Sequence, residues 1–135
     1  MEPKKSGFAG TPPDVEAVRK DFEEFLVQLE STPSEKVVVL FGFAWANEIY
    51  EHDWLDLHLT GSELRARVAE AEAAGLGSIG SDDLFITLPA LGVERLYCHE
   101  ADIHVIAADP RHPYVETERQ RWLELGWQVS PCTEG

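Results

Sequence analysis

The sequence is short of basic residues, and this shortage excludes several classes of partner. Its 135 residues contain 11 lysines and arginines against 25 aspartates and glutamates, so the formal net charge is −14. No lysine follows Lys36. Binding to nucleic acid or to an anionic membrane draws on positive side chains that meet phosphate groups. We therefore expect neither direct nucleic-acid binding nor membrane association.

Cysteine and long apolar runs are scarce as well. The two cysteines, Cys98 and Cys132, form no C-x-x-C pair and have no metal-ligand spacing, and whether they pair with each other stays open. No stretch approaches the ~20 apolar residues of a membrane span, and the first residues lack the apolar core of a secretory signal. We therefore expect a cytoplasmic protein. No motif indicates a cofactor, and none is predicted.

The rest of the composition is typical of one globular domain. Apolar residues make up 44% of the chain and charged residues 27%, and 135 residues can bury a core without a metal or a disulfide. Residues 1–13 are rich in proline and glycine and have no periodicity, so we predict a flexible N-terminal arm. Residues 14–130 are predicted to form a single α+β domain, and residues 131–135 a C-terminal tail.

Three segments have the apolar periodicity and the end signals of helices. The first begins after Asp14, and the second begins after the capping-box sequence Thr60-Gly61-Ser62-Glu63. The third covers residues 115–125. Their expected ends are Ser31-Thr32-Pro33, Gly75 and Gly126. On the last helix we expect Glu118 and Arg121 to face solvent, and Trp122, Leu123 and Leu125 to face the core.

Apolar, β-branched runs predict the strands. These runs lie at residues 37–43, 54–59, 84–88, 93–98 and 103–107, and residues 127–129 add a short edge strand. Strands that follow one another without an intervening helix favour antiparallel pairing. We therefore predict an α+β fold, with a mixed or mainly antiparallel sheet of about five strands and three helices packed mostly on one face.

The segment Gly75-Leu76-Gly77-Ser78-Ile79-Gly80 matches the letters of a dinucleotide-binding loop, but its context does not fit. Such a loop follows a strand and opens a helix, so that helix N–H groups face the pyrophosphate. These glycines instead follow a predicted helix and lead to a predicted strand. We interpret them as a helix stop and a connector. No catalytic residue is assigned anywhere in the chain.

The densest polar cluster is Cys98-His99-Glu100-Ala101-Asp102-Ile103-His104. The favoured interpretation is a hairpin with a solvated loop at residues 99–102. The alternative is a metal site, in a small metal-binding protein or a metal-dependent hydrolase. Its ligands would be His99, Glu100, Asp102 and His104, with help from His58. The two interpretations differ in whether the ring nitrogens of His58, His99 and His104 converge.

A second cluster mixes carboxylates with aromatic side chains over residues 44–58. It lies in the most acidic part of the chain, since residues 37–110 hold 13 acidic residues against 3 basic ones. Tryptophan and tyrosine bury large rigid surfaces at interfaces, and carboxylates pair with a partner's basic side chains. The predicted partner-binding residues are Trp45, Glu48, Tyr50, Glu51, Asp53, Trp54, Asp56, Glu100 and Asp102.

These observations favour a non-enzymatic interaction protein that binds and occludes a basic protein partner. The kind of partner expected is a nuclease toxin, a nucleic-acid-handling protein or a secreted effector, which makes an immunity-protein or inhibitor role one instance. The hypothesis rests on charge and size. Two alternatives stay open: the metal-dependent function, and a homodimer or scaffold subunit that uses the aromatic residues.

Overall fold

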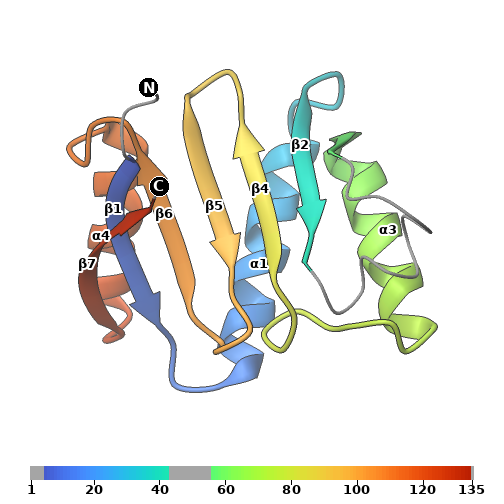
Figure 1. The fold of residues 1–135 in the computed structure, drawn as a ribbon, viewed down its shortest axis with the longest axis horizontal. Helices are drawn as coiled ribbons and strands as arrows, with labels where there is room; N and C mark the ends of the chain where they lie inside the picture. Colours follow the sequence, from blue (N-terminus) through green and yellow to red (C-terminus); the bar gives the residue numbers. More distant parts are fainter. Residues whose placement is uncertain (1–4, 43–55, 135) are drawn as a thin grey trace.

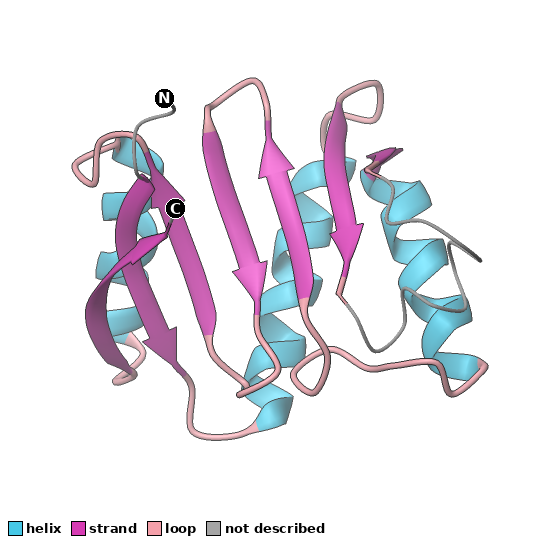
Figure 2. Ribbon diagram, in the orientation of Figure 1, coloured by secondary structure: helices cyan, strands magenta, loops and turns pink. Residues whose placement is uncertain are grey.

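The computed structural model describes residues 5–42 and 56–134, which form an antiparallel sheet with helices behind it (Figures 1 and 2). Within these ranges seven strands follow the spatial order β3-β2-β4-β5-β6-β1-β7, and every neighbouring pair is antiparallel. The strands are β1 (Lys5–Thr11), β2 (Lys36–Phe41), β3 (Leu57–Thr60), β4 (Leu84–Leu88), β5 (Val93–Tyr97), β6 (Ile103–Ala107) and β7 (Gln128–Glu134). Consequently β1, β2 and β5 finish at the end of the sheet where the other four strands begin.

The helices of the described ranges lie on the same face of the sheet (Figure 1). They are α1 (Val15–Glu30), α3 (Gly61–Ala73) and α4 (Pro113–Glu124). The predicted start signals are present: the Asp14 carboxylate accepts a hydrogen bond from the Ala17 backbone N at 2.9 Å, and Thr60 and Glu63 form a reciprocal capping box. The predicted α+β class is therefore confirmed. None of these helices combines the length and the apolarity needed to cross a bilayer.

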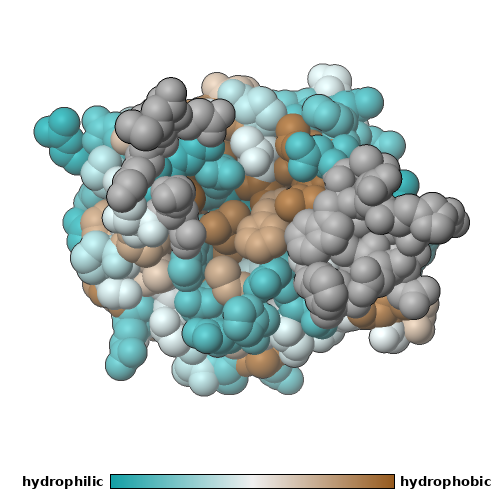
Figure 3. Space-filling view, in the orientation of Figure 1, coloured by the Kyte–Doolittle hydropathy of each residue, from teal (hydrophilic) through white to brown (hydrophobic). Residues whose placement is uncertain are grey.

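Alternation along the strands gives the sheet a helix-covered face and an open face. Phe41 of β2 and Ile86 of β4 are fully buried under the helices. Their neighbours in sequence, Leu40 and Phe85, point to the other face, pair with each other across β2 and β4, and are half-buried. Figure 3 shows that the centre of this open face is apolar. The sheet therefore packs one side against the helices and leaves apolar surface on the other.

Both chain ends form strands, which corrects two predictions. Residues 5–11, predicted within a flexible arm, form β1 between β6 and β7, and residues 131–134, predicted as a tail, extend β7. The sheet therefore has seven strands rather than about five. Glycine in the first segment suggested flexibility, but close packing requires it: a Cβ atom at Gly10 would lie 2.5 Å from the Trp122 ring.

The glycine-rich segment of residues 75–80 belongs to the connection between α3 and β4. Gly75 has a φ of +72°, the left-handed conformation in which helices commonly end. The segment therefore follows a helix and leads to a strand, as predicted, and the orientation that a dinucleotide loop needs does not occur here.

Candidate functional site

Six of the nine predicted partner-binding residues lie outside the described residues: Trp45, Glu48, Tyr50, Glu51, Asp53 and Trp54. The other three lie at the end of the sheet where β2 and β5 finish. Asp56 directly precedes β3, and Glu100 and Asp102 belong to the turn between β5 and β6 (Figure 1). Asp56 and Glu100 are exposed, whereas the Asp102 side chain is only 18% exposed. Asp56 and Glu100 are therefore accessible to a partner.

The described connections at this end of the sheet are rich in carboxylates. They are residues 12–14, 74–83, 98–102 and 125–127, together with Asp56. These connections contain no lysine or arginine. Their acidic residues, which we call the acidic end, are Asp14, Asp56, Asp82, Asp83, Glu100 and Asp102. Both α3 and α4 finish here, and the partial negative charge at their C-termini has the same sign.

The opposite end of the sheet has mixed charge. Its described connections are residues 31–35, 89–92 and 108–112. Their charged residues are Glu35, Asp109 and Arg111, and Lys5 and Lys36 begin strands beside them. Segments that are distant in sequence thus bring like charges together at one end of the sheet and opposite charges at the other. This separation follows from the antiparallel topology.

The predicted metal ligands divide into two groups at the turn between β5 and β6. The chain reverses over residues 98–102, where Ala101 has a φ of 60°, so the predicted hairpin loop is confirmed. Asp102 and His104 face each other, with 2.9 Å between Asp102 Oδ2 and His104 Nε2. A straight strand would have placed Glu100 beside them, but its side chain is 77% exposed. The structure therefore brings together two of the four predicted ligands.

His99 is held away from that pair by Asp83. The Asp83 carboxylate accepts a hydrogen bond from the His99 backbone N at 2.7 Å and lies 3.0 Å from its Nδ1 atom. This contact raises the pKa of His99 above its ordinary value, which favours the charged imidazolium. His58 is also remote, because β2, β4 and β5 separate its strand from β6, which corresponds to about 19 Å. The three histidines do not converge.

A different set of side chains meets on the open face, and we call Cys98, Asp102 and His104 the open-face cluster. One potential ligand atom from each residue lies within 4.8 Å of the other two. The His104 imidazole also hydrogen-bonds to the sulfur of Cys132, and these contacts with Cys132 and Cys98 raise the pKa of His104 well above its usual range. Burial raises the pKa of the Cys98 thiol.

The open-face cluster leaves one polar atom without a partner. Asp102 Oδ1 is buried and accepts no hydrogen bond from any described residue. A buried carboxylate oxygen without a partner is unfavourable, because it has lost its hydrogen bonds to water and forms none within the protein. Asp102 and His104 were among the ligands predicted from the sequence, whereas neither cysteine was. The available signal was the hairpin register, which places Cys98 beside Asp102, and nothing in the sequence indicated the approach of Cys132.

A second group of charged side chains lies under the sheet and was not predicted. Arg95 of β5 is 1% exposed and contacts Asp21 of α1 and, at 2.5 Å, Glu118 of α4. Arg121 lies 2.5 Å from Asp21 and 2.6 Å from Glu118. We call these four residues, with the hydroxyl groups of Tyr97 and Tyr114 that hydrogen-bond to Arg95, the buried ionic cluster.

The buried ionic cluster corrects the predicted orientation of α4. Glu118, expected to face solvent, is 7% exposed, whereas Leu123 and Leu125, expected in the core, are 44% and 54% exposed. Trp122 is buried, as predicted. In the cluster, two arginines balance two carboxylates, and both oxygens of each carboxylate accept hydrogen bonds from described residues. The cluster therefore joins α1, α4 and β5 without an unpaired charge.

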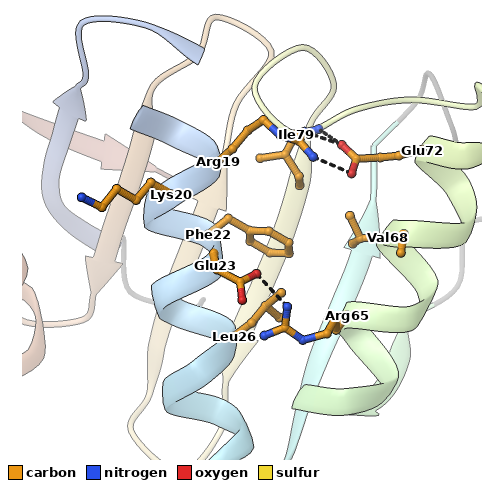
Figure 4. A pocket seen from close by; sticks show the side chains of 10 residues that line it. Arg19, Lys20, Phe22, Glu23, Leu26, Arg65, Val68, Glu72 and Ile79 are labelled. Carbon is orange, nitrogen blue, oxygen red and sulfur yellow. Dashed lines mark hydrogen bonds and ion pairs between the residues drawn. The ribbon is translucent and has the colours of Figure 1, made fainter. Parts of the chain in front are cut away.

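A groove of about 370 Å³ runs between α1 and α3 (Figure 4). Two ion pairs cross it, Arg19 with Glu72 at 2.6 Å and Arg65 with Glu23 at 2.7 Å, and Lys20 points away from it. The apolar side chains beneath are Phe22, Leu26, Val68 and Ile79, and each of them is already buried. The groove is therefore a bridged seam between two helices, and its two arginines are engaged by carboxylates.

Two features of the described residues thus have groups available for binding: the acidic end, with its exposed carboxylates, and the open-face cluster, with its unpartnered oxygen. The buried ionic cluster and the seam between α1 and α3 are internally paired. No protein-family model, curated protein or solved structure matches the chain at a significant level, so a function for it has to be inferred from its own residues.

Proposed function

We propose that this chain is a protein-interaction domain whose acidic end binds and occludes a basic protein partner, as an immunity protein or inhibitor does. The observation that carries the proposal is the separation of charge between the two ends of the sheet. A chain that is acidic only for solubility has no reason to exclude lysine and arginine from every described connection at one end while placing both at the other.

The physical basis is the complementarity of electrostatic potential. Carboxylates gathered on one end raise the rate of encounter with a positively charged surface and disfavour partners of the same sign. A protein that binds phosphate groups has a basic cleft, and carboxylates that occupy this cleft compete with its natural ligand. No catalytic group is needed for this action.

Asp56 and Glu100 are the described residues best placed for the contact, because both are exposed and neither forms a described ion pair with a lysine or arginine. The remaining predicted contact residues, over residues 45–54, belong to the proposal on their sequence alone. Their tryptophan and tyrosine side chains would supply the apolar anchors that carboxylates lack. A cytoplasmic location is part of the proposal, and it is supported by the free thiols of Cys98 and Cys132.

The proposal is tested by a pair of charge-reversed variants. Asp56→Lys with Glu100→Lys alters the acidic end, and Glu35→Lys with Asp109→Lys alters exposed carboxylates at the opposite end. Each double variant changes the formal charge by the same amount, from −14 to −10. Binding of a labelled oligoarginine peptide, followed by fluorescence anisotropy, should weaken about tenfold for the first variant and by less than about twofold for the second.

The same two variants are then used as baits to capture basic proteins from the cells in which the chain occurs. We expect the Glu35→Lys/Asp109→Lys variant to retain a partner that the Asp56→Lys/Glu100→Lys variant loses, and added salt to slow association with it. Equal behaviour of the two variants in both assays contradicts the proposal, because the effect would then depend on net charge rather than on the acidic end.

A further inference from the structure

The open-face cluster lies at one point of the sheet because of the strand register. His104 pairs with Leu96 across β6 and β5, and Cys98 follows two residues later on the same face, where its backbone N donates to the Asp102 carbonyl oxygen at 3.0 Å. Side chains two residues apart in a strand share a face. Thiol, carboxylate and imidazole therefore face the same space.

Cys132 approaches the cluster across β1, which carries small residues there. On the open face β1 contributes Ala9, in register with His104, and Gly7, in register with Cys132. No bulky side chain of β1 thus stands between β6 and β7, and the Cys132 sulfur reaches the His104 ring, where it hydrogen-bonds. A fourth potential ligand therefore adjoins His104, although its sulfur lies outside the group of atoms within 4.8 Å of one another that Cys98, Asp102 and His104 form.

We propose that Cys98, Asp102 and His104 form a binding site for Zn²⁺, with Cys132 as the fourth ligand. Two thiolates, an imidazole nitrogen and a carboxylate oxygen form a ligand set that zinc accepts in tetrahedral coordination. At bond lengths of about 2.0–2.3 Å, tetrahedral ligand atoms lie about 3.3–3.8 Å apart. The atoms of the open-face cluster, all within 4.8 Å of one another, need to move by about an ångström.

The unpartnered Asp102 oxygen is an independent indication of a ligand. The Oδ2 atom of Asp102 is engaged by His104, whereas the buried Oδ1 atom of the same carboxylate has no donor from the described residues. A cation bound between the carboxylate and the thiols would satisfy it. On binding, each thiol and the His104 ring nitrogen that becomes a ligand give up their protons to solvent as the sulfur and nitrogen atoms bond to the metal.

The chemistry of the ligands selects the ion. Calcium and magnesium prefer sets made only of oxygen atoms, which the acidic end offers and the open-face cluster does not. Soft thiolates with imidazole favour zinc among the common divalent ions. This site differs from the one predicted from the sequence, since two cysteines take the places of His99 and Glu100. It does not depend on whether the acidic end binds a partner.

The test is a titration of the full chain with Co²⁺, a spectroscopic substitute for Zn²⁺, after removal of any affinity tag and under reducing conditions. We expect one equivalent to bind with a sulfur-to-cobalt charge-transfer band and the visible bands of tetrahedral cobalt, and Zn²⁺ to displace it. Competition with a chromophoric chelator then gives the zinc affinity.

Variants separate the open-face cluster from its neighbours. Cys98→Ser, Asp102→Asn and His104→Gln should each weaken zinc binding by at least about tenfold, the lower limit seen even for residues that only orient ligands. Cys132→Ser should reduce the charge-transfer intensity by about half. The matched controls are His58→Gln, His99→Gln and Glu100→Gln, which change the same residue types outside the cluster and should leave affinity and spectrum unchanged.

Two outcomes overturn the proposal. One is cobalt bound without a sulfur band, which means that surface carboxylates hold the ion. The other is an equal loss of affinity in His99→Gln and His104→Gln. Circular dichroism of each metal-free variant confirms that it is folded, and Cys132→Ser, at a half-buried position near the chain terminus, provides a test that leaves the core intact.

Discussion

Within residues 5–42 and 56–134, two clusters of partly or fully buried ionisable groups lie on opposite faces of the same sheet, and they differ in whether every polar atom has a partner. In the buried ionic cluster every carboxylate oxygen has a partner, and the charges of two arginines balance those of two carboxylates. In the open-face cluster one carboxylate oxygen is buried without a partner. A complete network of this kind has a structural role, whereas an incomplete one has capacity for a ligand.

Position explains the difference. The buried ionic cluster lies between the sheet and two helices, where any unpaired charge would be costly and water cannot compensate for it. The open-face cluster lies on the face that no described helix covers (Figure 1), and its Asp102 and His104 side chains each keep 18% of their surface exposed. The two clusters therefore face different constraints: one joins two helices to β5, and the other lies at the turn between β5 and β6.

The largest expected effect on the free energy of unfolding comes from a substitution in the buried ionic cluster. Arg95→Met removes the guanidinium that contacts both carboxylates and leaves Arg121 as the one arginine of the cluster for both Asp21 and Glu118. Breaking a buried ion pair in this way costs about 3–5 kcal/mol in free energy of unfolding. Urea denaturation of wild type and variant measures this loss in the free energy of unfolding. A loss below about 1 kcal/mol would show that the cluster tolerates an unpaired charge and would remove the distinction between the two clusters.

The second effect appears at acidic pH. Burial alone would raise the pKa of Asp21, but Arg95 and Arg121 outweigh it, and the folded-state pKa is lowered. A depressed folded pKa gives stability that is present above the unfolded pKa, about 3.9, and is lost as pH falls through the folded value. The free energy of unfolding should fall by up to about 1.4 kcal/mol per pH unit for this one group.

Asp21→Asn isolates that contribution. The stability difference between wild type and Asp21→Asn should be constant above about pH 5 and should shrink below about pH 4. Urea denaturation at a series of pH values measures the difference. A gap that does not change with pH would mean that the Asp21 carboxylate is not ionised with a depressed pKa in the folded protein.

A smaller effect is expected from the incomplete cluster. In metal-free protein, Asp102→Asn removes one contact with His104 and a carboxylate whose other oxygen has no partner, so the free energy of unfolding should change by less than about 1 kcal/mol. Asp21→Asn is the matched comparison, because the same substitution there breaks a complete network. Equal losses from the two substitutions would show that the open-face cluster is structural too.

The smallest effect gives the baseline. Arg119 pairs with Glu116 on the exposed side of α4, and its guanidinium lies 5.3 Å from the centre of the Phe8 ring. Exposed pairs of this kind are worth little, so Arg119→Gln should cost no more than about 0.5 kcal/mol in the same urea experiment. A cost similar to that of Arg95→Met would mean that burial does not decide the strength of these pairs.

Local signals in the sequence predicted much of the fold. The caps at Asp14 and Thr60 and the strands around residues 84–107 depend on residues within a few positions of one another, and they occur as predicted. β1 and β7 were missed because they are stabilised by pairing with distant strands. Their own residues, rich in glycine or containing proline, have low strand propensity.

The sites were harder to predict than the elements. Asp21 and Arg95 are 74 residues apart, and no periodicity reports such a contact. A partial signal existed, since Arg95 shares a strand face with Val93 and Tyr97, which marks it as inward-facing. For the open-face cluster, the two-residue spacing of Asp102 and His104 indicated that their side chains share a strand face. The approach of Cys132 depends on the position of β7, which only the assembled sheet determines.

The most direct measurement is the X-ray absorption spectrum of the zinc-loaded chain at the zinc edge. A site formed by the open-face cluster and Cys132 predicts scattering from sulfur at about 2.3 Å together with nitrogen or oxygen at about 2.0 Å. A first shell of oxygen atoms alone, as the carboxylates of the acidic end would provide, would contradict the view that the open-face cluster is an incomplete set of metal ligands.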